Sequence, residues 1–515
     1  MRDEVAGEKG RSSPLLAPDD RHNRDLVANV HPPAWNNPAP AERYDLVVLG
    51  AGTAGLVCAA GAAGLGARVA LIERHLMGGD CLNFGCVPSK AVLRAAKAWH
   101  AAASGASFGA PIAASGGDSA RAMERMRALR AEISRNDSAE RFRRLGVDVF
   151  LGSAHFIGRD RITVEGTELR FRRAVIATGA RAAAPPISGL SSVAYRTNET
   201  IFELESAPAR LAILGAGPIG CELAQAFARM GSRVTLLDRE PRILPRDDAD
   251  AAAVVARALE RDRVKVVTNA AVTSVGARGD EKVLTVSAPD LPAGELIADE
   301  LLVATGRAPS LESLDLDRAG VAYGRDGLRV DARLRTSNRR IFACGDVTNR
   351  YPFTHAADAG ARIVIQNALF LGRARADRVA IPWCTYTAPE LAHVGMTARD
   401  AEHTAHVATI TIPYAELDRA RLDGADDGFL RIHAARRSGR ILGATIVGAR
   451  AGETIGQITL AMTAGVTLGK IAAAVYPYPT YGEALKKAAD AWRRTKLTPR
   501  TKRILAIVRY LGVRI

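Results

Sequence analysis

The sequence predicts an α/β protein with two parallel-sheet units and a third α/β domain of another kind at its C-terminal end. Two segments, residues 44–74 and 210–239, each pass from a continuously apolar run through a glycine-rich turn into a small-residue run and a second apolar run. A continuous apolar run is typical of a strand covered on both faces in a parallel sheet. Residues 381–492 alternate strand-like and helix-like runs without such a turn, which predicts a separate domain.

The overall composition excludes several classes of protein. The chain has 515 residues, 48% of them hydrophobic, which is enough for about three packed domains. No apolar run reaches the roughly 18 residues of a membrane span, and the first residues lack the apolar segment of a secretory signal, so we expect a cytoplasmic protein. The net charge of +15 permits nucleic-acid binding. However, we find neither an RNA-binding motif nor zinc-finger spacing, and we expect no nucleic-acid partner.

The N-terminal 43 residues differ from the rest of the chain. They are polar and rich in proline, and we expect an extension largely without regular structure. Val30 and Trp35 are the side chains through which it would dock on the body of the protein. Regular structure is expected to begin at Tyr44.

Both glycine turns match GxGxxG between a strand and a helix, the setting of a Rossmann-like dinucleotide-binding unit. The three glycines permit, in order, a tight turn, close approach of the backbone to a pyrophosphate, and close packing of helix on strand. They are Gly50, Gly52 and Gly55 in the first unit and Gly215, Gly217 and Gly220 in the second. An acidic residue follows the first glycine by 23 positions in both units, Glu73 and Asp238, and is placed to accept hydrogen bonds from ribose hydroxyls.

Two such units predict two dinucleotide cofactors. In the second unit Asp238 favours NADH over NADPH, because a carboxylate repels the 2′-phosphate of NADPH. Arg239 and Arg242 favour the opposite preference if they bind that phosphate, and have no bearing on it if they are simply solvated. We expect NADH to be preferred.

The segment GGDCLNFGCVPSK, residues 78–90, is the strongest signal in the chain. Regular helix does not bring two residues five positions apart within disulfide distance, so Cys81 is expected in a distorted turn made possible by Gly85. Pro88 suits the first turn of a helix over residues 87–104. Cys86 would then lie near a helix N-terminus, where the dipole and Lys90 favour the thiolate.

A redox or nucleophilic pair explains Cys81 and Cys86 better than a structural role. A disulfide closing so short a loop would stabilise little and would be unexpected in the cytoplasm. A zinc site normally needs four ligands, and no second close pair exists in the sequence. We interpret the other four cysteines as small buried apolar residues: Cys58, Cys221, Cys344 and Cys384.

Taken together, the glycine units and CLNFGCVPSK resemble the class I pyridine nucleotide–disulfide oxidoreductases, the family of dihydrolipoamide dehydrogenase, glutathione reductase and mercuric reductase. The resemblance covers residues 44–492 and implies two Rossmann-like domains, for FAD and NAD(P), and a C-terminal α/β dimerisation domain. With the flanking segments, the chain divides into an N-terminal extension (1–43), an FAD-binding domain (44–198), an NAD(P)-binding domain (199–318), a central FAD-binding segment (319–380), a dimerisation domain (381–492) and a basic tail (493–515).

The resemblance also implies roles for single residues. Cys81 would be the interchange thiol that faces the substrate, and Cys86 the charge-transfer thiol beside the flavin. Lys90 would lie near flavin N5 and pair with Glu222, because a buried lysine keeps its charge only beside a carboxylate. The second glycine unit would hold NAD(P), with Arg239 at its edge. The residues that would hold FAD, besides the first glycine unit and Glu73, are Thr178, Gly179, Gly345 and Asp346.

The segment VYPYPTYGEALKKAAD, residues 475–490, departs from the disulfide reductases of this family. They carry a histidine as general acid–base, oriented by a glutamate, where this chain has Tyr478 and Glu483. Mercuric reductases also have tyrosine there, so the chain resembles that branch most. It departs from that branch too, since no cysteine pair follows Cys384 and no metal-binding domain with a CxxC motif precedes the first unit.

The tail contains eight basic residues and no acidic one after Asp490. Its apolar residues follow helical spacing: Ile504, Leu505, Ile507, Val508 and Leu511. Such a helix would lie on an anionic membrane or pack its apolar face on the dimer.

We therefore expect a homodimeric FAD enzyme that passes electrons from NAD(P)H to Cys81 and Cys86 and then to a small-molecule or metal-ion acceptor. Mercuric ion, held transiently by the two thiols, is the first candidate. A dihydrolipoamide dehydrogenase-like or other disulfide or quinone reductase is the second. A redox-silent, membrane-associated flavoprotein is a third, against which the intact cysteine motif argues.

Overall fold

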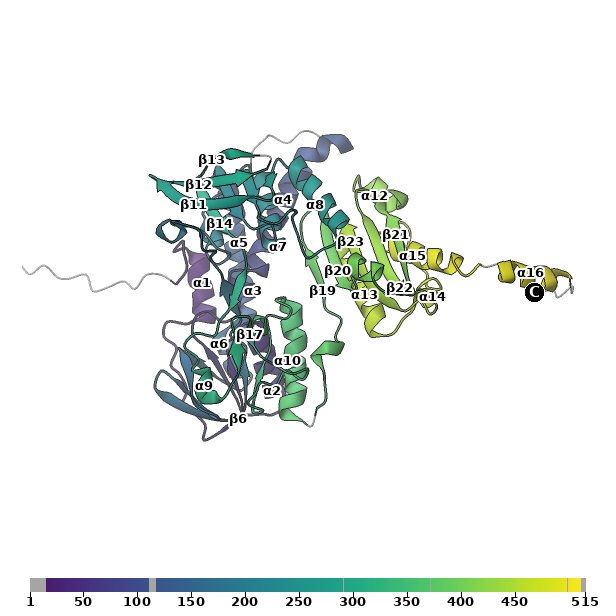
Figure 1. The fold of residues 1–515 in the computed structure, drawn as a ribbon. Helices are drawn as coiled ribbons and strands as arrows, with labels where there is room; N and C mark the ends of the chain where they lie inside the picture. Colours follow the sequence, from purple (N-terminus) through teal and green to yellow (C-terminus); the bar gives the residue numbers. More distant parts are fainter. Residues whose placement is uncertain (1–14, 111–116, 290, 371, 498, 511–515) are drawn as a thin grey trace, which may run out of the picture.

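The computed structural model describes residues 15–110, 117–289, 291–370, 372–497 and 499–510. They form two α/β units, one above the other in Figure 1, and a C-terminal domain beside them that ends in a projecting helix. The expectations for residues 1–14 and for Leu511 lie outside these residues. None of the described helices is long and apolar enough to cross a membrane.

The first unit, the lower one in Figure 1, is built on a parallel sheet of order β3-β2-β1-β6-β18, which β5 and β4 continue in antiparallel fashion. Its strands are β1 (Tyr44–Leu49), β2 (Val69–Glu73), β3 (Val147–Leu151), β4 (Ala154–Gly158), β5 (Arg161–Val164), β6 (Thr167–Ile176) and β18 (Ile341–Ala343). Its helices are α2 (Thr53–Gly64), α3 (Gly79–Asn83), α4 (Cys86–Ser104), α5 (Ser119–Ser134), α6 (Ala139–Arg144) and α10 (Thr354–Leu369). The apolar runs of β1 and β2 are buried on both faces, as a strand inside a parallel sheet requires.

The second unit repeats this design on a smaller scale. A parallel sheet of order β10-β9-β8-β14 adjoins an antiparallel meander β11-β12-β13. The elements are β8 (Arg210–Leu214), α7 (Pro218–Arg229), β9 (Arg233–Leu237), α8 (Ala249–Arg261), β10 (Lys265–Val267), β11 (Ala271–Arg278), β12 (Glu281–Ala288), β13 (Leu291–Ala298) and β14 (Glu300–Val303).

After β14 the chain returns to the first unit. β15 (Arg307–Pro309) already pairs with β7 (Ala180–Ala182), and α9 (Leu316–Ala319) lies against β4. After the short hairpin β16–β17 (Tyr323–Gly324, Gly327–Leu328), β18 joins β6 in parallel and α10 packs against α2. The central segment therefore completes the first sheet, as the resemblance implies.

The C-terminal domain carries an antiparallel sheet of order β19-β20-β23-β22-β21 with helices packed on it. Its elements are β19 (Pro382–Thr385), β20 (Glu390–Gly395), α11 (Ala398–Glu402), β21 (Val407–Pro413), α12 (Asp418–Leu422), β22 (Phe429–Ala435), β23 (Ile441–Gly448), α13 (Ala451–Thr463), α14 (Leu468–Ile471), α15 (Glu483–Arg494) and α16 (Pro499–Tyr510). The first strand of the domain begins at Pro382.

The N-terminal extension is more ordered than its composition predicts. Residues Arg21–Val30 form helix α1, whose first turn is capped by the side chain of Asp20. Asp20 also pairs with the buried guanidinium of Arg127 on α5 at 2.5 Å. The expectation of little regular structure is thus wrong for residues 21–30, because a capped helix with an apolar face docks on α5. Val30 is buried and the indole of Trp35 donates to the Val149 carbonyl at 3.1 Å, so both contact the body as expected.

Buried polar contacts attach the C-terminal domain to the second unit. The Thr445 hydroxyl donates to the carboxylate of Asp248 at 2.7 Å, and the Trp383 indole donates to Asp247 at 2.8 Å. Because these contacts hold β19 against the second unit, the residues just after β19 come to lie beside α4 and α7. The C-terminal domain thereby supplies one wall of the region around Cys86.

Candidate active site

Cys81 and Cys86 lie on two consecutive helices separated by a break. Cys81 is in the short helix α3, and Cys86 is the first residue of α4. The distortion expected around Cys81 falls after it, at Phe84 and Gly85. A Cβ on Gly85 would lie 2.8 Å from a carboxylate oxygen of Asp80 and 3.0 Å from its carbonyl oxygen, so a side chain here would force Asp80 to shift. Helix α4 covers the predicted span with one residue more at its start.

The two thiols are free and electrostatically unequal. The hydrogen bond from Cys81 lowers the pKa of the Cys86 thiol to about 6, against the effect of burial, and the Thr354 hydroxyl at 3.2 Å and the Lys90 ammonium lower it further. The same hydrogen bond and burial raise the pKa of Cys81. At neutral pH the pair therefore holds one thiolate, on Cys86, and one proton, on Cys81.

Lys90 forms the ion pair that the resemblance implies. Its ammonium lies 2.7 Å from Oε2 of Glu222 on α7, whose side chain is only 5% exposed. The other carboxylate oxygen, Oε1, accepts the backbone N–H of Tyr386 at 2.8 Å, and the Lys90 ammonium lies 4.9 Å from the centre of the Tyr386 ring. One residue of the C-terminal domain therefore contacts both partners of the pair.

A second polar cluster includes Asp80, the residue just before Cys81. The guanidinium of Arg307 is 3.1 Å from the carboxylate of Asp80 and 3.7 Å from that of Asp346, and the amide of Asn198 donates to Asp80 at 2.9 Å. Burial raises the pKa of Asp346. Among the described residues, Nε of Arg307 is buried without a hydrogen-bond partner. A polar cofactor beside Asp346 would satisfy it, so these residues fit the FAD site that the resemblance implies.

The two glycine turns have nearly the same geometry. Gly50 and Gly215 have φ of 96° and 102°, which L side chains rarely adopt. A Cβ on Gly55 or Gly220 would lie less than 2 Å from the carbonyl oxygen of the first glycine of its turn. Helices α2 and α7 follow with no side-chain cap, so their first N–H groups are available to phosphate oxygens.

The acidic residue of each unit holds its own turn. Glu73 accepts the N–H of Ala51 at 2.7 Å, and Asp238 accepts the N–H of Ala216 at 2.5 Å. Carboxylate oxygens accept more than one hydrogen bond, so this contact is compatible with binding a ribose hydroxyl as well. Both turns thus fit a dinucleotide.

Thr178 and Gly179 connect the end of β6 to the chain returning from the second unit. The Thr178 hydroxyl donates to the Ser310 carbonyl at 2.7 Å, and the Gly179 carbonyl accepts the Ser310 N–H at 2.9 Å. Gly345 has φ of 81° and, with Cys344 and Thr348, lines a small cavity of about 50 Å³. These residues therefore surround the end of the first sheet.

Tyr478 and Glu483 lie apart from the cysteines. The Tyr478 side chain is 70% exposed and its hydroxyl donates to Asp418 at 2.8 Å, while Glu483 begins α15 and accepts the N–H of Thr480 at 3.3 Å. Among the described residues of one chain, neither is in contact with Cys81 or Cys86. A single chain does not bring these two halves of the predicted site together.

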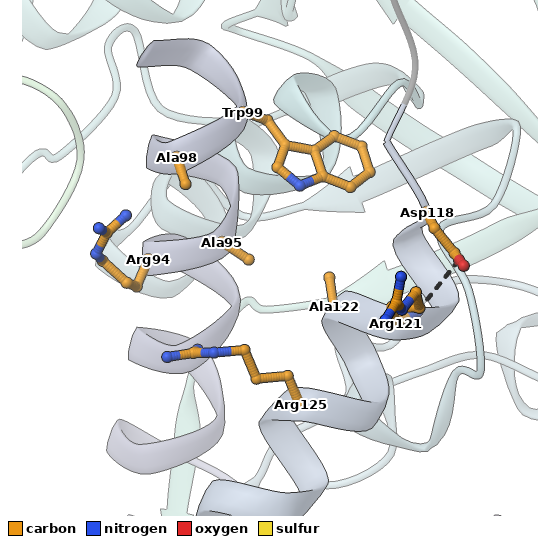
Figure 2. A pocket seen from close by; sticks show the side chains of 8 residues that line it. All are labelled: Arg94, Ala95, Ala98, Trp99, Asp118, Arg121, Ala122 and Arg125. Carbon is orange, nitrogen blue, oxygen red and sulfur yellow. Dashed lines mark hydrogen bonds between the residues drawn. The ribbon is translucent and has the colours of Figure 1, made fainter. Parts of the chain in front are cut away.

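A cavity of about 460 Å³ lies away from the cysteines, between the second half of α4 and the start of α5 (Figure 2). Arg94 and Arg125 line it, together with Trp99 and three alanines. In the described part of the chain, neither arginine has a carboxylate partner. The cavity contains none of the residues that the sequence analysis singled out.

Sequence reasoning missed four residues of the site: Asp80, Thr354, Arg307 and Tyr386. Asp80 precedes Cys81 directly, and an acidic neighbour of a reactive cysteine was a usable signal. Each of the other three contacts a residue of the site that lies more than 200 positions away in the sequence, and no local sequence pattern identifies them. Of the remaining cysteines, Cys58, Cys221 and Cys344 are buried, as expected, and Cys384 is partly buried.

Comparison with known families agrees with this geometry. Residues 44–361 match the model described as pyridine nucleotide-disulphide oxidoreductase, and residues 381–489 match the dimerisation domain of the same family. The chain therefore belongs to the pyridine nucleotide-disulphide oxidoreductase family. It is an FAD- and NAD(P)H-dependent oxidoreductase with a redox-active disulfide, and its dimerisation domain supports a homodimer.

Relatives with different activities are similarly close. The mercuric reductase of Bacillus cereus is 34% identical over 86% of this chain and 71% of that protein. The dihydrolipoyl dehydrogenase of Zymomonas mobilis is 30% identical over 88% of this chain and 98% of that protein. The solved structure of the HOCl-induced flavoprotein disulfide reductase RclA from Escherichia coli superposes with a TM-score of 0.78 at 30% identity, covering 87% of this chain and 99% of that one.

Proposed function

We propose that this enzyme uses NADH to reduce a thiophilic metal ion, with mercuric ion as its substrate. The observation that carries the proposal is the pair of adjacent free thiols, one ionised and one protonated, in a chain with a phenol where the disulfide reductases of the family carry an imidazole. Mercuric ion is soft and takes two sulfur ligands, so it needs the thiols more than it needs a proton donor.

The thiols would act in sequence. FAD, when bound, would relay two electrons from one NADH to open the Cys81–Cys86 disulfide, and two more from a second NADH to the metal ion that the thiols hold. The Cys86 thiolate, with its charge stabilised by Lys90, binds the metal first. Cys81 then loses its proton and becomes the second sulfur ligand. The overall reaction is balanced: NADH and Hg(II) give NAD⁺, Hg(0) and one proton.

The preference for NADH is supported by the contacts and exposure of Arg242 and Arg239, the two arginines that follow Asp238 in the sequence. The guanidinium of Arg242 donates to the backbone carbonyls of Leu244, Pro245 and Asp247, which occupies it within the protein. Arg239 is 87% exposed, and its guanidinium lies 3.5 Å from the carboxylate of Glu240. Neither arginine is therefore held as a fixed cation for a 2′-phosphate.

Tyr478 would act across the dimer. Its exposed position on the dimerisation domain leaves it available to the active site of the other subunit, where a phenol would be a further ligand or hydrogen-bond donor near the metal. The hydrogen bond to Asp418 raises the pKa of Tyr478, so the phenol stays protonated at neutral pH. A cytoplasmic setting suits the proposal, because NADH and reduced thiols are maintained there.

A disulfide substrate is the second candidate, favoured by the similarity to dihydrolipoyl dehydrogenase. Reduction of a disulfide releases thiolates that need protons at neutral pH, which an imidazole supplies better than a phenol. We therefore expect slow turnover with lipoamide or glutathione disulfide. Cu(II) is included as a further acceptor, because RclA has been solved as a Cu(II) complex.

The test compares acceptors under one set of conditions. NADH oxidation by the purified holoenzyme is followed with Hg(II), Cu(II), lipoamide, glutathione disulfide and a quinone, and Hg(0) is measured as vapour. We expect Hg(II) to be reduced, less efficiently when excess thiol competes for the metal. Inhibition by Hg(II) without NADH oxidation at any thiol concentration would remove it as substrate. Failure of NADH to reduce the protein beyond two electrons would instead favour a redox-silent flavoprotein.

A further inference from the structure

Helix α16 lies outside the hydrophobic core of the C-terminal domain, which is packed without it. The preceding helix, α15, buries its apolar residues in the core of the C-terminal domain and ends with the buried ring of Trp492. Helix α16 then projects away from the molecule (Figure 1). Four of its large apolar side chains are exposed to solvent, with exposed fractions from 49% to 91%: Ile504, Leu505, Ile507 and Tyr510. The domain therefore does not need α16 for its own packing.

Most of the apolar side chains form one face between two basic edges. Over residues 503–510, at about 100° per residue, Ile504, Leu505, Ile507 and Val508 fall within one arc of roughly 160°, and Tyr510 lies outside it. Arg503 and Arg509, both exposed, fall outside this arc on opposite sides. An apolar face bordered by cations is the pattern of a helix that lies in the interface of an anionic bilayer.

Charge distinguishes among the possible occupants of this face. Residues 493–515 contain eight basic residues, none of the 25 residues after Asp490 is acidic, and the whole chain carries a net charge of +15. A second copy of this chain would bring the same positive charge to the contact, which repels. Nucleic acid would neutralise the arginines but leave the isoleucines and leucine exposed to water. An anionic phospholipid surface satisfies both features at once.

We propose that α16 anchors the enzyme to anionic phospholipid membranes as a peripheral helix. Its apolar face enters the boundary between headgroups and acyl chains, Tyr510 lies at headgroup level, and the arginines contact lipid phosphates. A homodimer carries two such helices, so one bilayer engages both and the binding is stronger than that of a single helix.

The experiment measures co-sedimentation of the full-length holoenzyme with vesicles. One set contains phosphatidylcholine with phosphatidylglycerol, and the other contains phosphatidylcholine alone. We expect binding to the anionic vesicles at least about ten-fold stronger than to the neutral ones, and weaker as salt is raised. Equal binding to both sets would overturn the proposal.

Three variants separate the contributions. A chain ending at Leu497 should lose vesicle binding while NADH still reduces the flavin. The double substitution Ile504→Glu and Ile507→Glu should do the same, since it places charge on the apolar face. Arg503→Glu with Arg509→Glu should weaken binding to anionic vesicles by about 25-fold or more, at about five-fold per basic residue, and the matched pair Arg503→Lys with Arg509→Lys should leave it nearly unchanged.

Two results would assign the helix to another partner. If the shortened chain becomes monomeric in analytical ultracentrifugation, the apolar face belongs to the dimer and the proposal is wrong. If the protein binds duplex DNA and only the arginine reversals abolish that binding, while Ile504→Glu has no effect on any ligand, the helix contacts nucleic acid through charge alone. Unchanged vesicle binding by the shortened chain also refutes the proposal.

Discussion

The two glycine turns of this enzyme share one local geometry in two different surroundings. Another segment approaches the first turn closely, since a Cβ on Gly52 would lie 3.7 Å from the Cα of Gly79. The second turn is open, since a Cβ on Gly217 would have no atom within 4 Å. Burial also raises the pKa of Glu73 in the first unit.

This difference indicates how each unit uses its ligand. A dinucleotide enclosed by a second segment of the chain leaves slowly, whereas one bound at an open turn exchanges quickly. We infer that the first unit holds FAD as a resident cofactor and that the second exchanges NAD(P)H at each turnover. Identical motifs thus acquire different roles from what the rest of the chain packs against them.

The largest expected effect comes from placing the same methyl group in each turn. In Gly55→Ala the new Cβ would lie 1.8 Å from the Gly50 carbonyl oxygen, and in Gly220→Ala it would lie 1.9 Å from that of Gly215. Each backbone must shift, so each unit should lose its own ligand by at least about 100-fold in affinity. Gly55→Ala should yield protein without flavin absorbance, and Gly220→Ala yellow protein that NADH reduces poorly. Equal loss of flavin in both variants would contradict the comparison.

The next effect concerns the two thiols of the first unit, Cys81 and Cys86. Cys81→Ala removes the hydrogen bond that lowers the pKa of Cys86, so that pKa should rise above about 6 by one unit or more. Because the thiolate is the reactive form, alkylation of the reduced enzyme by iodoacetamide should slow about five-fold or more at pH 6 and hardly at all at pH 9. The control Cys86→Ala leaves only Cys81, which should be alkylated at least about thirty-fold more slowly at pH 7. The opposite ranking of the two variants would reverse the roles assigned to the thiols.

A third change tests the acidic residue of the open turn. Asp238→Ser removes the carboxylate that repels a 2′-phosphate, so kcat/KM for NADPH relative to NADH should rise about ten-fold, or about 1.4 kcal/mol. In the control, Glu73→Gln should alter flavin retention and leave this ratio unchanged. A native enzyme that already prefers NADPH ten-fold would refute the role given to Asp238.

The smallest effect is expected at Tyr386, where the two units and the C-terminal domain meet. Tyr386→Leu removes the ring beside the Lys90 ammonium, a contact worth about 0.5–1 kcal/mol at a partly exposed position. The lysine then supports the Cys86 thiolate less well, and the pKa of Cys86 should rise by a few tenths of a unit. Tyr386→Phe keeps the ring and the backbone N–H that binds Glu222, and should match the native titration. A shift in the phenylalanine variant would assign the effect to the hydroxyl instead.

The features recognisable from the residues alone are those that depend on near neighbours. The glycine turns, the helix that begins at Cys86 and the apolar strands follow from backbone sterics and short spacing, and the structure has them where they were expected. Helix α1 was missed although its cap, Asp20, is also local, because the stability of a ten-residue helix comes from docking on α5. Composition does not reveal such a docking surface.

The features that depend on contacts between distant residues could be identified only from the folded structure. Thr354 contacts Cys86 across 268 positions of sequence, and Arg307 contacts Asp80 across 227. No periodicity links such residues, because their proximity results from the return of the chain to the first sheet and from the docking of the C-terminal domain. The enclosure of one glycine turn, the opening of the other, the separation of Tyr478 from the cysteines and the bare face of α16 are likewise properties of packing. Sequence patterns therefore predict the chemistry that each segment is capable of, and tertiary contacts decide which segments perform it together.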